Sequence, residues 1–216
     1  MVSSNSEPGT SGAGCEVIVD PAVTPQRDVY KILIGSVVPR PIGFVSSISP
    51  TGQRNLAPFS FFNAVCGEPP MVFFSTSNRE PRKDTYVNVK ATREFVVNIV
   101  SEEIAEKMNL TSGDYPYGAD EFEIAGLTPV PSDLIRPPRV RESHVNMECK
   151  VVHIVDLSER PGGTTMFVGE VIRFHVDDAL VDNFRVDPAK LKAVGRMGGN
   201  EYSRTRDRFE MIRPKV

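Results

Sequence analysis

The segment SNREPRKDTYVNV contains the residues best suited to binding an anion. Arg79, Arg82 and Lys83 lie just before or at the start of a predicted helix, and Thr85 adds a hydroxyl donor. Free backbone N–H groups and the positive end of the helix dipole favour negative charge at such a position. The segment therefore predicts a phosphate site, although the same residues also fit a helix that Asp84 caps beside a solvated basic loop.

Two further stretches carry polar groups where a strand is usually apolar. FVSSIS places Ser46 and Ser47 in the middle of a predicted strand, where their hydroxyls either serve a ligand or, for one of them, face water. NLAPFSFFNAV carries Asn63, whose amide offers a donor and an acceptor and so suits a ring such as the pyrimidine edge of a flavin. An isolated asparagine more often bonds its own backbone, so both interpretations stay open.

The sequence offers no recognisable nucleophile or metal set. His144, His153 and His175 share no HxH, HExxH or His–carboxylate spacing, and GxSxG, Walker and GxGxxG patterns are missing. His153 alternates with Cys149 and other apolar residues along one predicted strand face, which places it in the core or at its rim. We therefore expect a binding groove, no metal site and no catalytic side chain.

Composition narrows the range of partners. The 216-residue chain has a net charge of −3, which gives no general attraction for nucleic acid or an anionic membrane. Cys15, Cys66 and Cys149 form no CxxC pair and predict reduced thiols in a cytoplasmic protein. Residues 1–20 lack the features of a signal peptide and predict a flexible tail, and no apolar run is long enough to span a membrane. We expect one domain over residues 21–216.

Hydrophobic periodicity predicts more strands than helices, with most strands in adjacent antiparallel pairs. Helices are expected at 24–40, 82–92 and 101–110, and strands at 41–49, 55–65, 69–76, 94–100, 144–157 and 165–176. Thr24 and Ser101 are the expected helix caps, and Pro58 places its strand at a sheet edge or bulge. Segment 111–140 shows little periodicity, which is typical of functional loops. The pattern predicts a mainly β fold, a closed or partly split β-barrel with peripheral helices.

Several of these motifs, in this order, resemble one known family. RPIGFVSSISPTGQRNLAPFSFFNAVCGEPPMVFFS, RKDTYVNV, EFVVNIV, RESHVNMECKVVHI and GRMGGNEYS are similar to the flavin reductase-like, FMN-binding split-barrel proteins, close to the flavoredoxin-type branch. The resemblance covers roughly Tyr30 to Tyr202. It implies a six-stranded antiparallel split β-barrel and a homodimer that binds FMN near the subunit interface.

The resemblance also implies roles for individual residues. Near the ribityl chain and phosphate it places Ser46 and Ser47, and around the phosphate itself Arg82, Lys83, Asp84 and Thr85. Along the isoalloxazine ring it places Asn55, Ala57, Ser60, Asn63 and Ala64. Near the flavin, where a nicotinamide or another partner would stack, it places Arg196, Gly198, Gly199 and Tyr202. His144 stands in SHV where many relatives have Ser-Pro-Val, so it inherits no role and is expected to face solvent.

These implications lead to three hypotheses of different classes. The first is an FMN-binding oxidoreductase that takes hydride from NADH or NADPH and passes electrons to an acceptor, with the flavin carrying the chemistry. The second is a flavoredoxin-like FMN electron carrier that receives electrons from a protein partner and has no nicotinamide site. The third is a barrel without flavin that serves as an interaction module, which the intact motifs disfavour.

Overall fold

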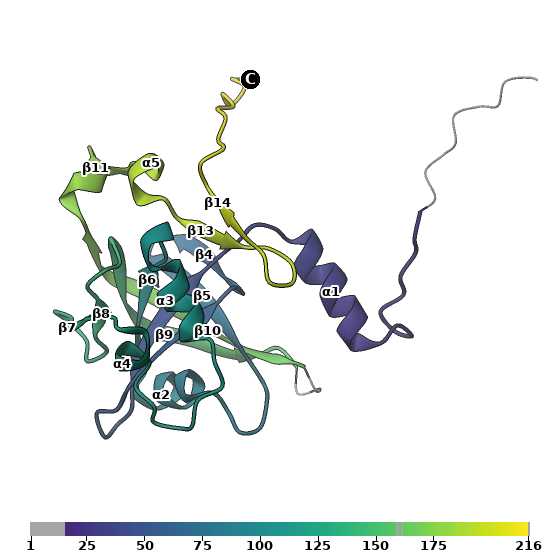
Figure 1. The fold of residues 1–216 in the computed structure, drawn as a ribbon, viewed down its shortest axis with the longest axis horizontal. Helices are drawn as coiled ribbons and strands as arrows, with labels where there is room; N and C mark the ends of the chain where they lie inside the picture. Colours follow the sequence, from purple (N-terminus) through teal and green to yellow (C-terminus); the bar gives the residue numbers. More distant parts are fainter. Residues whose placement is uncertain (1–15, 159, 161, 216) are drawn as a thin grey trace, which may run out of the picture.

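The computed structural model describes residues 16–158, 160 and 162–215, so Cys15 and most of the expected N-terminal tail lie outside the described residues. The helices are α1 (Gln26–Ser36), α2 (Asp84–Thr92), α3 (Ala105–Leu110), α4 (Glu121–Ala125) and α5 (Pro188–Leu191), with 3-10 turns at Glu102–Ile104 and Asp178–Leu180. The strands are β1 (Arg40–Pro41), β2 (Gly43–Ile48), β3 (Arg54–Phe59), β4 (Phe62–Gly67), β5 (Pro70–Ser77), β6 (Glu94–Ile99), β7 (Pro129–Val130), β8 (Arg139–Val140), β9 (Val145–Asp156), β10 (Thr164–Val176), β11 (Val181–Asp182), β12 (Arg185–Val186), β13 (Val194–Arg196) and β14 (Tyr202–Arg204). The predicted mainly β fold with peripheral helices is confirmed (Figure 1).

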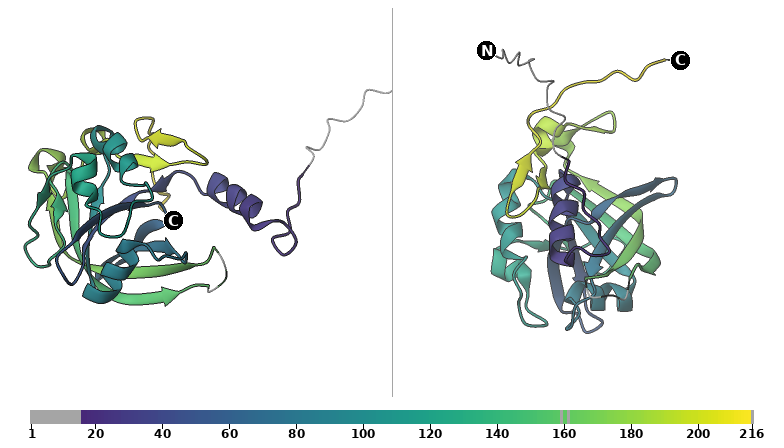
Figure 2. Two further views of the ribbon diagram at one scale, coloured as in Figure 1. Left: turned by 60° about the horizontal axis from the view of Figure 1, so that its bottom comes forward. Right: turned by 90° about the vertical axis from the view of Figure 1, so that its right-hand side faces the viewer.

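The central sheet has seven antiparallel strands in the order β3-β2-β6-β9-β10-β5-β4. Its two edge strands, β3 and β4, follow each other in the chain and are separated only by Ser60 and Phe61. The sheet must therefore curl until its edges approach, as Figure 2 shows, and the Ser75 N–H donates to the Phe61 carbonyl at 2.9 Å where they meet. Among the described strands β3 and β4 are not paired, so no hydrogen-bonded ladder closes the barrel.

The central sheet has seven strands where six were expected, because one predicted strand forms two separate strands. The stretch NLAPFSFFNAV, expected to be one strand, is interrupted at Ser60 and Phe61 and contributes β3 to one edge and β4 to the other. The expected antiparallel pairing of adjacent strands is confirmed for β2 and β3, and Pro58 lies in an edge strand opposite Phe44. An edge position suits proline because the missing N–H costs no ladder hydrogen bond there.

Two hydrophobic clusters hold the barrel. In the first, Phe74 packs against Phe59, Phe95 and Phe167 with ring centroids 5.0–5.3 Å apart. The second lies on the other face of β2 and includes Phe44 together with residues of α3 and α4. Since Phe44 and Val45 alternate between the two clusters, β2 is buried on both faces. Cys149 is a buried core residue as expected, and burial raises the pKa of its thiol.

Several local expectations were wrong. Thr24 does not cap α1, because Pro25 occupies the N-cap position, and Ser101 makes no capping hydrogen bond to the 3-10 turn that leads into α3. His153 is exposed, because Val168 pairs with His153 while the next residue, Gly169, pairs with Val151. The extra residue in β9 forms a β-bulge, which shifts the alternation of inward-facing and outward-facing side chains along the strand.

The segments expected to be irregular contain short elements. Segment 111–140 holds α4 and the β7–β8 pair, and near the C-terminus β13 joins β1 to β14 in a small second sheet. This sheet lies next to α1, which extends away from the barrel (Figures 1 and 2). Within the described part of the chain, no helix is both long enough and apolar enough to cross a membrane.

Candidate functional site

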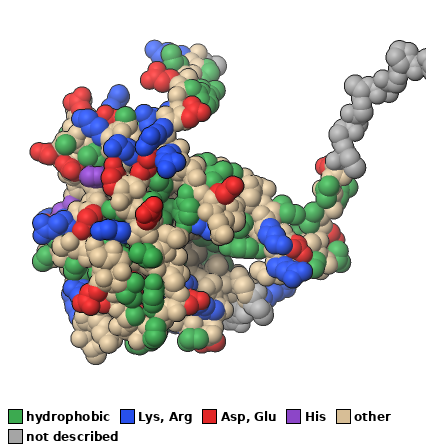
Figure 3. Space-filling view, viewed as in Figure 1, with side chains coloured by type: hydrophobic (Ala, Val, Ile, Leu, Met, Phe, Trp, Pro, Cys, Tyr) green, Lys and Arg blue, Asp and Glu red, His purple; other side chains and the backbone are tan. Residues whose placement is uncertain are grey.

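A groove of about 850 Å³ lies between α1 and the meeting edges of the barrel. Figure 3 shows α1 standing apart from the main body with a recess beneath it. We call it the main groove, and the residues that line it on the barrel side include Pro58, Phe59, Ser60, Phe61, Ser75, Ser77 and Lys83. Helix α1 contributes Tyr30 and Ile34 among others. The bend between β3 and β4 thus forms one wall of the groove.

Lys83 supplies positive charge to the main groove. It is the residue immediately before α2, and its side chain is half-buried. Burial first, and then the positive charge of Arg79, lower the pKa of its ammonium. Lys83 forms no ion pair in the described structure, whereas Arg79 pairs with Asp114 at 2.6 Å. An anion in the groove would therefore meet a lysine ammonium that no described carboxylate already pairs with.

Three predicted site residues meet in a buried hydrogen-bonded network beneath α2. The Asn55 amide donates to Thr85 Oγ1 at 2.8 Å and to Ser47 Oγ at 3.2 Å. Asn88 also donates to Ser47 Oγ, at 3.3 Å. Because these side chains bond one another, they join β2, β3 and α2 and position the start of the helix. The Ser46 hydroxyl is likewise buried and donates to the Pro138 carbonyl.

Two other predicted phosphate residues bond to neighbouring protein groups. Arg82 donates to Asn78 Oδ1 at 2.6 Å and lies 4.8 Å from the centre of the Tyr86 ring. Asp84 is the first helical residue and not the cap, and its carboxylate accepts the Gly118 N–H at 2.9 Å. Asp84 thus ties α2 to segment 111–140, which fixes the approach to the helix.

The structure separates the predicted ring-binding residues. Only Ser60 lines the main groove, while Ala57 is half-buried against the barrel core. Asn63 and Ala64 lie exposed on edge strand β4, where Asn63 Oδ1 accepts the N–H of Ala64 at 2.8 Å. This is the local bond that an isolated asparagine favours.

A second cavity, of about 590 Å³, adjoins the main groove. We call it the arginine cavity, because Arg40 and Arg196 both line it. The residues it shares with the main groove are Tyr30, Ile34, Pro58, Ser60 and Gly199. Arg196 lies 4.5 Å from the centre of the Tyr202 ring and donates to the Gly199 carbonyl. The predicted substrate-side residues, Gly198 among them, therefore belong to the β13–β14 hairpin, and Ser60 lines both cavities.

Sequence reasoning missed three lining residues. Ser75 and Ser77 belong to FFSTS, a run of hydroxyl side chains at the end of a predicted strand that could have indicated a polar lining. Arg40 is only 5% exposed and donates to the carbonyls of Val37, at 2.8 Å, and Met197, at 2.9 Å. No sequence signal marks Arg40, because its burial depends on a loop far away in the chain.

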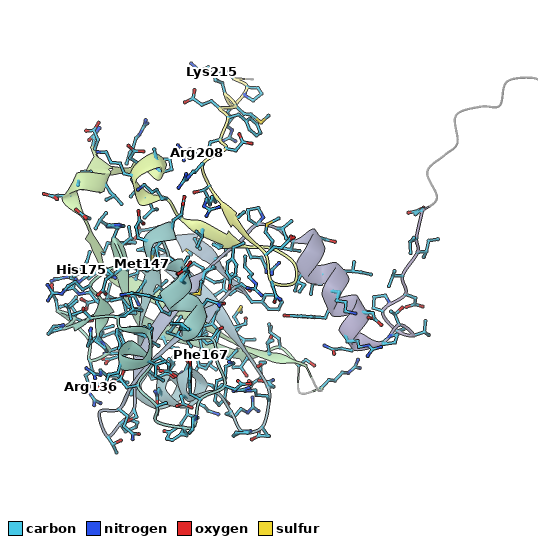
Figure 4. All side chains as sticks on the ribbon, in the orientation of Figure 1. Arg136, Met147, Phe167, His175, Arg208 and Lys215 are labelled. Atoms are coloured by element: carbon cyan, nitrogen blue, oxygen red, sulfur yellow. The ribbon has the colours of Figure 1, made fainter. Side chains whose placement is uncertain are left out.

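A cluster of Asp133, Glu148 and His175 lies elsewhere, on the side of the barrel away from α1 (Figure 4). Their ligand atoms fall within 4.8 Å of one another, although the sequence spacing suggested no metal set. Glu148 accepts His175 Nε2 at 2.6 Å and the backbone N–H groups of Asp133 and Leu134, each at 2.8 Å. Burial raises the pKa of Glu148, but these hydrogen bonds outweigh it and hold that pKa below its ordinary value. The cluster is explained as an anchor for the 131–138 loop. His144, half-buried nearby, lies 3.3 Å from Asp177.

Comparisons with known proteins agree with this fold. Residues 34–188 match the model of the flavin reductase like domain. An uncharacterised protein of Aquifex aeolicus is 46% identical over 177 residues, which cover 81% of this chain and 88% of that protein. The uncharacterised protein YwrF of Bacillus subtilis is 36% identical over 87% of this chain and 94% of its own.

Solved structures of similar proteins have the same fold. Nitrilotriacetate monooxygenase component B from Bacillus cereus is 34% identical with a TM-score of 0.88, over 92% of this chain and 100% of that chain. The 2-nitrobenzoate 2-nitroreductase NbaA of Pseudomonas fluorescens is 33% identical with a TM-score of 0.84, over 92% and 96% of the two chains. Flavoredoxin of Desulfovibrio vulgaris, at 22% identity and a TM-score of 0.71 over 81% and 91%, shares the fold. The chain described here belongs to the flavin reductase-like family.

Proposed function

We propose that this protein is an FMN-binding oxidoreductase that accepts hydride from NADH or NADPH. The observation that carries the proposal is the main groove, where Lys83 precedes α2 and has no ion pair with any described residue, and where an adjoining cavity can admit a second substrate. Family membership supports a flavin in this groove. The groove volume of about 850 Å³ also falls within the range of small-molecule and cofactor sites.

The donors of the groove fit an elongated ligand with one anionic end. Lys83 would bind the phosphate by a charge-assisted hydrogen bond, and Ser75 and Ser77 offer hydroxyls along the adjacent strand β5. Ser60, at the bend between β3 and β4, would lie beside the ring because it borders both cavities. The buried network of Ser47, Asn55 and Thr85 does not line the groove, so it would act on the ligand by positioning α2.

The division of labour follows from these contacts. A bound flavin supplies hydride acceptance and onward electron transfer, so no acid–base side chain is required. The chain itself would bind the phosphate through Lys83 and orient the ring against the bend at Ser60. Fixed donors near the ring would stabilise negative charge that develops on reduction.

Steady-state oxidation of NADH and NADPH by FMN-loaded protein tests this function. Oxygen, ferricyanide and added FMN serve as acceptors, and turnover well above that of free FMN is expected with one of the two nicotinamides. Protein that retains FMN but oxidises neither nucleotide with any acceptor would remove the reductase function. That outcome would favour the electron-carrier alternative, which the fold shared with flavoredoxin leaves open.

We further propose a homodimer in which a second copy covers α1 and contributes to the edge of the flavin site. Helix α1 has no buried residue, and its large apolar side chains Tyr30, Ile32, Leu33 and the following Val37 are 46–55% exposed. An unpartnered apolar helix of this kind usually marks an interface. Light scattering at micromolar concentration should give a dimer, and a monomer would contradict this part of the proposal.

A further inference from the structure

The arginine cavity contains positive charge and hydrogen-bond donors but no acidic residue. Its charged lining residues are Arg40 and Arg196, and no Asp or Glu lines it in the described structure. The polar groups that complete the lining are Tyr30, Ser60, Asn109, Ser112, Asn200 and Tyr202. A cavity with this lining attracts an anion and repels a cation.

Arg40 is the more informative of the two arginines because it is buried. It is 5% exposed, and its donors bond to neutral groups, namely the carbonyls of Ile34, Val37 and Met197 and the hydroxyl of Ser60. It forms no ion pair with any described carboxylate, although buried charges are normally paired. The fold thus keeps, in the lining of the cavity, a buried positive charge that no carboxylate of the described chain neutralises.

Arg196 adds a second, more exposed charge beside the first, because Arg40 and Arg196 are cross-strand partners in the β1–β13 pair. One of its N–H groups donates to the Gly199 carbonyl, and its guanidinium is held over the Tyr202 ring at 4.5 Å. Like Arg40, it has no ion pair among residues 16–158, 160 and 162–215. The remaining guanidinium donors are free to bind a ligand, and the planar fork suits a carboxylate or phosphate.

We propose that the arginine cavity is an oxyanion site that binds the carboxylate or phosphate of the second substrate while the rest of that substrate reaches the main groove past Ser60. The inference rests on the proposed function, because it names the chemical class of the co-substrate. Its volume of about 590 Å³ accommodates one ring with its anionic group or a mononucleotide. A carboxylate substrate and a nicotinamide nucleotide would both supply such an oxyanion, and they differ in the group that carries it.

Calorimetric titration with two matched pairs of probes tests the site and separates the sources. The first pair is benzoate and benzamide, and the second is nicotinamide mononucleotide and nicotinamide riboside, so each pair differs in the anionic group. The anionic member should bind at least about tenfold more tightly in one pair or both, and added salt should weaken it. Stronger preference within the first pair assigns the site to a carboxylate substrate, and within the second to the nicotinamide nucleotide.

Variants tie the binding to this cavity. Arg196→Gln should weaken the anionic probe about tenfold and leave its neutral partner unchanged, while Arg196→Lys should retain part of the preference. Arg204→Gln, on the neighbouring strand β14, removes an equal charge that pairs with Glu102 at 3.0 Å and should change neither probe.

Two results would overturn the proposal: equal affinity within both pairs, or equal losses in Arg196→Gln and Arg204→Gln. The titrations are made on FMN-loaded and FMN-free protein and need no turnover. Failure of NAD(P)H oxidation would therefore bear on the proposed function, whereas failure of the paired titrations would bear on the oxyanion site alone.

Discussion

The side-chain amide of Asn55 lies 2.8 Å from Thr85 Oγ1, and this contact joins edge strand β3 to the first turn of α2. Both residues are almost fully buried. The helix start, and with it Lys83, is thereby held in a fixed position relative to the bend at Ser60. The geometry of the main groove depends on a hydrogen bond between residues that do not line it.

We predict that Asn55→Ala weakens FMN binding and lowers the free energy of unfolding by about 1–3 kcal/mol, because it leaves the buried Thr85 hydroxyl without its donor and the Ser47 hydroxyl with only that of Asn88. Asn63→Ala is the matched control, since Asn63 is exposed and bonds only its own neighbour in the described structure. Denaturant titration and FMN fluorescence titration measure the two effects. A larger loss of FMN affinity in Asn63→Ala would place the flavin ring along β4 instead.

Lys83→Ala should weaken FMN binding by roughly 10- to 100-fold, because it removes a charge-assisted contact to the phosphate worth about 1.5–3 kcal/mol. The loss should shrink as salt is raised, since screening already weakens the wild-type contact. Lys90→Ala serves as the control, because Lys90 is exposed on the same helix and bonds Tyr86. Equal affinities of wild type and Lys83→Ala would move the phosphate elsewhere.

The raised pKa of Glu121 leads us to expect a loss of stability as pH rises. Burial raises its pKa to about 7, although the Leu56 N–H that it accepts at 2.9 Å opposes the shift. The folded state therefore holds a proton that the unfolded chain releases near its ordinary pKa of 4.5, so the free energy of unfolding falls between about pH 4.5 and pH 7.

Glu121→Gln should remove this dependence and exceed wild type at pH 8 by on the order of 1–3 kcal/mol, with little difference at pH 4.5. Urea denaturation at several pH values measures it. Glu123→Gln, an exposed change on the same helix, should reproduce the wild-type profile. A Glu121→Gln profile that parallels wild type across this range would contradict the assignment.

Gly169→Ala should destabilise the barrel by about 1–3 kcal/mol. A Cβ at Gly169 would lie 2.5 Å from Phe95 Cζ and 3.1 Å from Cys149 Cβ, inside the aromatic cluster. Gly67→Ala, where a Cβ meets nothing within 4 Å, should change stability by less than about 0.5 kcal/mol. Thermal and urea unfolding compare them, and similar stabilities of the two variants would show that the cluster adjusts without cost.

Sequence periodicity identified the elements whose residues determine their own conformation. β6, β9 and β10 were predicted because long runs of alternating or apolar residues leave few other structures, and α2 because its start carries helix signals. The break of 55–65 at Ser60 was not predicted, because it follows from the curling of the whole sheet. The bulge that exposes His153 has no local signal either.

The predictions for the site residues divide in the same way, between residues with a local sequence signal and residues whose role depends on distant parts of the chain. Lys83 and Ser60 were expected from motifs, and both line the main groove. The side chains of Ser46 and Ser47 looked available for a ligand because their partners, Pro138 and Asn88, come from other parts of the chain. Arg40 was missed for the converse reason, since its significance lies in a burial that sequence does not show.

The most direct test of the central claim is the absorption spectrum of the purified protein, saturated with FMN if needed, before and after anaerobic addition of NADH or NADPH. The account predicts that the protein retains FMN through gel filtration and that one nucleotide rapidly bleaches the flavin absorbance. Protein that is colourless and takes up no added FMN would contradict it, because the main groove would then have another ligand.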